Sequence, residues 1–406
     1  MTTSAEQMRA WTGPAILSFG FRPFFLFGAV WAALAMTLWV VMLTGRDVLP
    51  TAFDPISWHA HEFLFGYLGA VLAGFLLTAV PNWTGRLPIV GWPLGALVAL
   101  WLAGRAAVAV SAFLPWSVVM AVDLAFPLAL VAVLAREIAA GRNWKNLPVL
   151  GLVLGMMLAN GLYHVDAGRG GYPAGGIGLR LGLAVAVMLI SLIGGRIVPS
   201  FTRNWLAQRR NTCLPVPFGR ADGAVLAVTL GALAVWVIWP AHTGTAALCA
   251  LAGAAQVWRL SRWSGRHTGA EALVWVLHAG YAFVPLGFFA VAAGQFAPGM
   301  GPAAQHVWMA GAVGLMTLAV MTRASLGHAG RPLHATGPIT TLYGALILAV
   351  LARFLAGGFP AQTWLLHLSA GAWIAAFAGF AVIYWPILAR PGNGRRRPTS
   401  AARPGA

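Results

Sequence analysis

Residues 58–86 contain the feature that most restricts how this chain can fold. The segment opens with His59, His61 and Glu62, continues through about twenty mostly apolar residues, and closes at Arg86. A helix of about twenty apolar residues is long enough to cross a hydrocarbon layer of roughly 30 Å. The segment therefore predicts a membrane-spanning helix with ligand-type side chains at one end and a cation at the other.

Apolar segments of this length recur throughout the chain. Of its 406 residues, 59% are hydrophobic and 9% are charged. This balance is typical of a polytopic membrane protein and not of a water-soluble domain of this size. We predict an all-α, integral membrane bundle of about twelve transmembrane helices. The expected spans are residues 23–44, 61–83, 92–113, 115–138, 147–166, 176–198, 221–239, 241–260, 270–293, 304–325, 337–357 and 361–389.

The chain is expected to have three regions. Residues 1–22 form a cytoplasmic N-terminal segment and residues 23–389 a single transmembrane domain. Residues 390–406 are rich in Arg, Pro and Gly and are expected to be a disordered cytoplasmic tail.

Membrane topology explains the formal net charge of +17. The basic residues gather in every second predicted loop and after the last span, whereas the alternate loops hold few. Basic loops face the cytoplasm, so both termini are expected there, in contact with anionic lipids. No basic module interleaved with aromatic residues is present, so nucleic acid is not an expected partner.

Two charged residues lie within predicted spans. Arg105 in span three and Asp123 in span four are each about eight residues from the outer end of their helix. Because a lone charge in the membrane is costly, we predict an intramembrane ion pair. A structural role is favoured over a place in a proton path.

Four histidines are expected at the outer ends of spans two, five and ten, near two carboxylates. Neutral imidazole is a good ligand for iron, copper and zinc, and helical bundles build such sites between facing helices. Each residue could instead be an ordinary polar group at the membrane interface. The predicted metal ligands are His59, His61, His164 and His306, and the predicted catalytic proton carriers are Glu62 and Asp166.

The first two of these histidines have a geometric restriction. On an ideal helix, residues two apart point about 200° away from each other. Either His59 precedes the helix in extended chain, or His59 and His61 serve different centres. Pro55 just upstream favours the extended chain.

A second candidate site lies at the inner face. Its cations could form a pocket for anionic groups, including haem propionates, or could simply set topology and contact lipid headgroups. His278, deeper in span nine, is either a ligand of a second centre or a buried histidine with ordinary hydrogen bonds. The inner candidates are Arg86, Arg196, Arg203, Arg323, His328 and Arg331.

Spans two and ten share a spacing that suggests an internal repeat. His61 is followed by Gly66 and Gly69 in the same register in which His306 is followed by Gly311 and Gly314. The Val-Pro motif of span six lies midway between them. Three four-helix units are therefore conceivable, with chance similarity as the alternative.

Several motifs together resemble the NnrS family of bacterial membrane proteins. They are Phe19-Gly-Phe-Arg-Pro-Phe-Phe25, Trp58-His-Ala-His-Glu62, Leu77-Thr-Ala-Val-Pro-Asn-Trp-Thr-Gly-Arg86, Gly195-Arg-Ile-Val-Pro-Ser-Phe-Thr202 and Thr322-Arg-Ala-Ser-Leu-Gly-His-Ala-Gly-Arg331. The resemblance implies a twelve-span protein of the bacterial inner membrane that carries haem and copper. It also implies a role in nitric oxide metabolism during denitrification or nitrosative stress.

We therefore expect one or two haem b groups, with copper as a further expected metal, and nitric oxide as the small-molecule substrate. The leading hypothesis is a haem-dependent, nitric oxide reductase-like oxidoreductase supplied by an unidentified electron donor. One alternative is a non-catalytic protein that binds nitric oxide or haem and protects against nitrosative stress. The other is a transporter of a metal or small anion.

Overall fold

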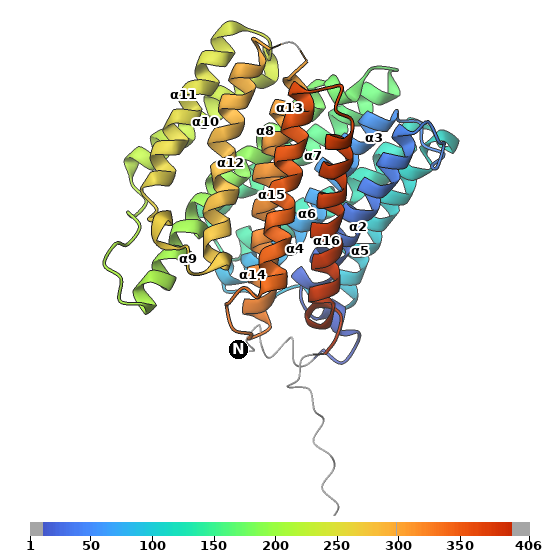
Figure 1. Cartoon of the computed structure of the whole chain (residues 1–406). Helices are drawn as coiled ribbons and strands as arrows, with labels where there is room; N and C mark the ends of the chain where they lie inside the picture. Colours follow the sequence, from blue (N-terminus) through green and yellow to red (C-terminus); the bar gives the residue numbers. More distant parts are fainter. Residues whose placement is uncertain (1–10, 298, 392–406) are drawn as a thin grey trace, which may run out of the picture.

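The computed structural model describes residues 11–297 and 299–391, and that part of the chain is helical and contains no strand. Long helices run side by side and are joined by short loops (Figure 1). The all-α prediction is confirmed. The helices are α2 (Phe21–Leu43), α3 (Pro55–His61), α4 (Leu68–Thr84), α5 (Trp92–Ala109), α6 (Trp116–Ala140), α7 (Leu147–Gly168), α8 (Ile177–Leu189), α9 (Gly195–Gln208), α10 (Arg220–Ile238), α11 (Thr243–Ser261), α12 (Ala272–Gly294), α13 (Gly301–His306), α14 (Met316–His328), α15 (Gly337–Gly358) and α16 (Trp364–Leu388).

Eleven helical segments of the described chain are long and apolar enough to cross a membrane. The remaining expected span is helix α11, which is not among them and carries the buried polar residues Gln256 and Arg259. It nevertheless runs alongside α10 and α12 (Figure 1). Arg259 forms an ion pair there with Asp222 of α10, with 3.2 Å between Nε and Oδ1.

The two ends of the described chain lie at the same face of the bundle. The Arg22 guanidinium donates a hydrogen bond of 3.1 Å to the carbonyl of Arg390. Because both ends lie at one face, the chain crosses the bundle an even number of times, as the predicted topology requires. We call this end the basic face, because its loops carry Arg86, Arg142, Arg210, Arg266 and Arg331. The predicted disordered tail lies outside the described residues, apart from its first two.

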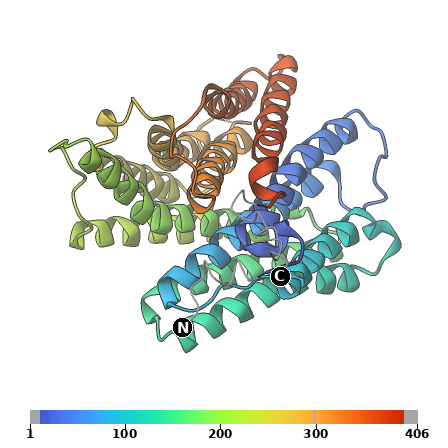
Figure 2. The ribbon, with the colours of Figure 1, turned by 90° about the horizontal axis from the view of Figure 1, so that it is seen from below.

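Three long spans form the centre of the bundle: residues 55–84, 177–208 and 301–328. Each is 72% buried over its most apolar window, against 28–61% for the other spans. Each is interrupted by a π-helical segment: η2 (Glu62–Tyr67), η6 (Ile190–Gly194) and η8 (Val307–Leu315). The three spans contact one another, and the other helices surround them (Figure 2). Equivalent central helices with equivalent interruptions support the three-unit repeat, and π-bulges occur frequently at functional sites.

The start of the second span differs from the prediction. Asp54 caps α3 by accepting hydrogen bonds from the amides of Ile56 and Ser57, each at 3.0 Å. Pro55 occupies the first turn, where its missing N–H costs nothing. The helix therefore begins before the histidines, and the prediction that His59 lies in extended chain is wrong.

A carboxylate ties two loops together at the basic face. Glu271, the residue before α12, accepts hydrogen bonds from the Ala335 amide at 2.9 Å, the Leu273 amide at 3.1 Å and His334 Nδ1 at 2.8 Å. Burial by itself would raise the pKa of Glu271. These hydrogen bonds outweigh burial and hold that pKa below its ordinary value.

Candidate metal centres

The helical start of α3 separates the four predicted ligands into two pairs. His61 faces α6 and α7, where it meets His164. His59 faces α2 and α13, where its ring lies near that of His306. A single convergence point for all four histidines is therefore not what the structure shows. The second possibility, two separate centres, is the one that the geometry supports.

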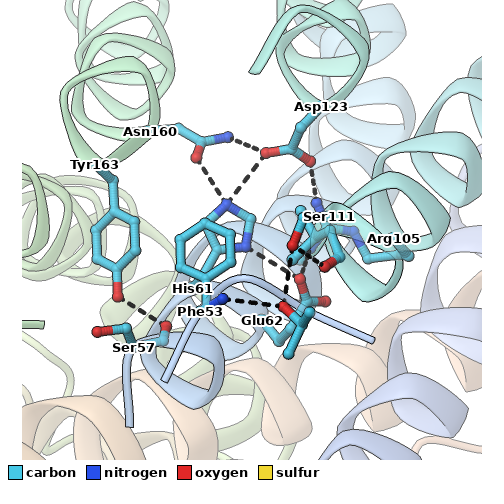
Figure 3. A network of polar contacts seen from close by, with 12 residues as sticks. Phe53, Ser57, His61, Glu62, Arg105, Ser111, Asp123, Asn160 and Tyr163 are labelled. Carbon is cyan, nitrogen blue, oxygen red and sulfur yellow. Dashed lines mark hydrogen bonds and ion pairs between the residues drawn. The ribbon is translucent and has the colours of Figure 1, made fainter. Parts of the chain in front are cut away.

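The first pair belongs to a buried cluster with the carboxylate of Asp123 (Figure 3). The nitrogen Nε2 of His61 lies 3.2 Å from Asp123 Oδ2, and Nε2 of His164 lies 3.0 Å from the same oxygen. One ligand atom from each residue falls within 4.8 Å of the others. Donors at metal bonds of roughly 2.0–2.2 Å lie at separations of this size. Two imidazoles and one carboxylate are a known ligand set for iron.

Glu62 holds His61 from the other side of its ring. His61 Nδ1 donates to Glu62 Oε1 at 3.0 Å, and the Trp31 indole donates to Oε2 at 2.8 Å. A ligating histidine commonly gives its second nitrogen to a carboxylate, which sets the ring orientation and strengthens the ligand. The π-helical segment η2 begins at Glu62. The helix therefore changes from α to π geometry at the residue that contacts His61.

The predicted intramembrane ion pair is confirmed and is part of a larger network. The Arg105 guanidinium donates to Glu62 Oε1 at 2.6 Å and also contacts Asp123 Oδ1. Asn160 donates to the other Asp123 oxygen at 2.7 Å. All of these side chains are nearly inaccessible to solvent. The pair thus holds two carboxylates in place beside His61, which gives it a role in the site.

The charge balance of this network allows one further positive charge. Two carboxylates face one guanidinium, and both His61 nitrogens face acceptor oxygens: Glu62 on one side, Asn160 and Asp123 on the other. A neutral imidazole donates only one hydrogen bond. The cluster is therefore satisfied either by a proton that makes His61 an imidazolium or by a metal ion at Nε2.

The second pair of histidines lines a cavity at the opposite end of the bundle from the basic face. The ring centroids of His59 and His306 are 6.2 Å apart and their planes differ by 12°. The cavity has a volume of about 60 Å³. Its walls also include Met36, Trp39, Phe63, Tyr67, Met309, Arg353 and Trp373.

The separation of the two rings fits a metal ion held between two histidines. Two metal–nitrogen bonds of roughly 2.0–2.1 Å, added to the radii of two imidazole rings, place the ring centroids about 6 Å apart. His306 Nδ1 is 2.7 Å from the Pro302 carbonyl, an orientation that leaves Nε2 for a metal. The ring of His59 packs on Trp39 at 4.1 Å, and its buried Nδ1 has no hydrogen-bond partner. Arg353 adds a cation to the wall of this cavity.

The remaining predicted residues lie apart from both pairs. Asp166 is half-buried against the loop at Gly171 and Gly176, and no contact with the cluster is found in the described chain. His278 is buried and its Nε2 lies 2.8 Å from the Thr202 hydroxyl. These are the surroundings of a buried histidine with an ordinary hydrogen bond.

The predicted inner pocket is only partly assembled. Arg86 pairs with Glu137, Arg196 donates to Asn146 at 3.2 Å, and Arg203 donates to the Pro215 carbonyl at 2.9 Å. Arg331 is exposed. Only Arg323 and His328 line a common cavity.

Sequence reasoning missed three residues of these sites: Asp123 as a ligand, Asn160 and Arg353. A signal existed for Asn160, which precedes His164 by four residues and therefore lies on the same face of α7. Asp123 was assigned only to its ion pair with Arg105. Arg353 had no sequence signal beyond its charge, because its partner elements are distant in the chain.

Comparison with known proteins identifies the family of the chain. No curated protein matches the chain. The family model described as NnrS protein matches residues 15–392, nearly the whole chain. The chain therefore belongs to the NnrS family of membrane proteins associated with nitric oxide.

Proposed function

We propose that this protein is a haem and metal protein of the bacterial inner membrane that binds and reduces nitric oxide. The observation that carries the proposal is the buried cluster of His61, His164 and Asp123, which offers three donor atoms within 4.8 Å beside a network in which two carboxylates face one guanidinium. Intramembrane ionisable groups mark functional sites by default. Nitric oxide is small and neutral, so it can reach such a cluster through lipid.

The two centres have separate residues. His59 and His306 would hold a haem b, with Arg353 near its propionates, and His61, His164 and Asp123 would hold a copper or other metal ion. When bound, these groups would supply electron transfer and a coordination position for nitric oxide. Both sets of ligands share helix α3, so the two centres would be close neighbours.

Glu62 is the proposed proton carrier. Reduction of two nitric oxide molecules to nitrous oxide consumes two electrons and two protons, and a protein group must deliver those protons inside the membrane. Glu62 Oε1 accepts a hydrogen bond of 3.0 Å from His61 Nδ1, and Glu62 is not one of the three residues of the cluster. Asp166 contacts neither centre, so Glu62 is the better placed of the two predicted carriers.

Metal analysis and the absorption spectrum of the purified protein test these assignments. We expect His59→Ala and His306→Ala to lose the haem spectrum, and His164→Ala to lose the second metal while keeping haem. His367→Ala, which replaces an exposed histidine on α16, is the matched control and should keep both. Wild-type spectra and metal content in the first three variants would overturn the assignment.

Nitric oxide consumption with an added electron donor separates turnover from binding. Glu62→Gln keeps the shape of the side chain and should slow nitric oxide consumption per bound metal ion. Full turnover in this variant would remove Glu62 from the proton route. A metal-loaded wild-type protein that binds nitric oxide without consuming it would instead be a non-catalytic protector.

A further inference from the structure

The most spacious cavity described in this protein lies near the basic face and belongs to neither metal centre. It has a volume of about 300 Å³ and opens between α2, α4, α9 and α14. Phe75, the lining residue of the second span nearest to His61, is 14 residues along the chain from it, or roughly 21 Å of helix. Its lining includes Phe25, Phe75, Thr78, Asn82, Phe201, Arg323 and His328.

Arg323 is a buried cation that no carboxylate contacts in the described part of the chain. Its side chain is 9% exposed, its guanidinium lies over the Phe201 ring at 4.3 Å, and its Nη1 has no hydrogen-bond partner. Within residues 11–297 and 299–391, no carboxylate lies within ion-pair distance of it.

The other buried arginines behave differently. Arg105 is paired with Glu62 and Asp123, and Arg259 is paired with Asp222. An unpaired buried charge is strongly unfavourable, because the protein does not replace the water that the charge has lost. The cavity beside Arg323 is therefore a favourable place for an anion.

The remaining walls indicate what kind of anion fits. Asn82 makes only a long hydrogen bond of 3.5 Å to the Thr78 carbonyl, so its amide can still donate to a ligand. His328, whose ring stacks on Phe21 at 5.4 Å, adds a second donor at the rim. Phe25, Phe75 and Phe201 supply apolar surface. Hydrogen-bond donors together with aromatic rings suit an oxyanion attached to an apolar body.

We propose that this cavity binds an oxyanion group, a phosphate or a carboxylate, which Arg323 neutralises while the attached apolar part lies against the phenylalanines. Basic pockets between membrane helices on the cytoplasmic side bind anionic lipid head groups. A free amphipathic anion offers the same chemistry. The site is independent of the proposed metal centres, since it shares no side chain with them.

The test compares Arg323→Met, Arg323→Lys and Arg331→Met in the delipidated full-length protein. Arg331 is the matched control, because it is an exposed arginine just beyond the same helix. The probes are phosphatidylglycerol, phosphatidylcholine, decanoate and inorganic phosphate. Binding is followed by native mass spectrometry and by the shift in unfolding temperature that each probe causes.

We expect phosphatidylglycerol or decanoate to raise the unfolding temperature of the wild-type protein and of Arg331→Met. Arg323→Met should lose at least tenfold in affinity, and Arg323→Lys should retain part of it. Binding of phosphatidylglycerol alone identifies a lipid head group, and equal binding of decanoate identifies a free anion. No difference between wild type and Arg323→Met for any probe would overturn the proposal.

A second readout guards against simple misfolding. Without any anion, Arg323→Met should unfold at a higher temperature than the wild type, because the substitution removes an uncompensated charge. Haem and metal content should be unchanged in this variant. A lower unfolding temperature without anion, or loss of haem, would also contradict the proposal, and neither result depends on whether the protein reduces nitric oxide.

Discussion

Replacing Arg105 by Met tests the polar network beside His61 directly. The guanidinium lies 2.6 Å from Glu62 Oε1 and also contacts Asp123, and all three side chains are at most 5% exposed. Met fills a similar volume but carries no charge. The variant would leave two buried carboxylates with only the His61 imidazolium as a counter-charge.

The expected cost follows from that imbalance. Removing one partner of a buried ion pair typically costs about 3–5 kcal/mol, because the remaining charge is left without compensation. The effect of a second substitution, Glu62→Gln, on the free energy of unfolding should have opposite signs in the Arg105→Met and wild-type backgrounds. In the Arg105→Met background, Glu62→Gln leaves Asp123 and His61 in balance and should restore stability. In the wild-type background, Glu62→Gln should destabilise by about 1–3 kcal/mol, since it weakens charged hydrogen bonds.

Reversible unfolding of the metal-free protein in mixed detergent and sodium dodecyl sulfate micelles gives the four free energies of this double-mutant cycle. We expect a coupling free energy of about 2 kcal/mol or more between positions 62 and 105. The reasoning is refuted if Arg105→Met costs less than about 1 kcal/mol, or if the two substitutions are additive.

Two further predictions concern a glycine of the network and the carboxylate at the basic face. A methyl group at Gly66 would lie 2.5 Å from Arg105 Nη1, so Gly66→Ala should cost about 1–3 kcal/mol and lower the metal content; Gly69→Ala, with its nearest atom 3.9 Å away, should do neither. Because the pKa of Glu271 lies below its ordinary 4.5, its hold on the Ala335 amide should persist above pH 4.5 and weaken as the pH falls further. Hydrogen exchange of that amide measures this, and protection that is equal at pH 3 and pH 7 would contradict it.

Much of the architecture could be predicted because apolar length is a one-dimensional property. Each span had to be about twenty residues long to cross the membrane, so cutting the sequence at its charged and Pro/Gly-rich breaks located the helices. Arg105 and Asp123 could be paired for the same reason, since equal depth on consecutive helices follows from counting residues. The shared spacing of His61 and His306 with their glycines also related spans two and ten, which are two of the three central spans.

The arrangement of the site depends on how each helix is rotated about its axis. Counting residues along the chain does not give that rotation. The spacing of His59 and His61 allowed either one centre or two, and the cap at Asp54 decided the matter by starting the helix early. Similarly, the sequence placed both Asp166 and Asp123 near the depth of the histidines in the membrane. Only the rotation of α6 and α7 shows that Asp123 faces the histidines.

The sequence by itself determined a multi-pass helical membrane protein of the NnrS family, with its histidines gathered at the ends of three spans and its cations at the opposite face. Depth in the membrane is set by position along the chain, and the hydrophobic effect enforces it. Tertiary structure alone decided which side chains meet, that four histidines form two separate pairs, and that Arg323 faces a cavity while Arg105 faces two carboxylates. Contacts between helices depend on rotation and packing among segments far apart in sequence, and no local pattern records them.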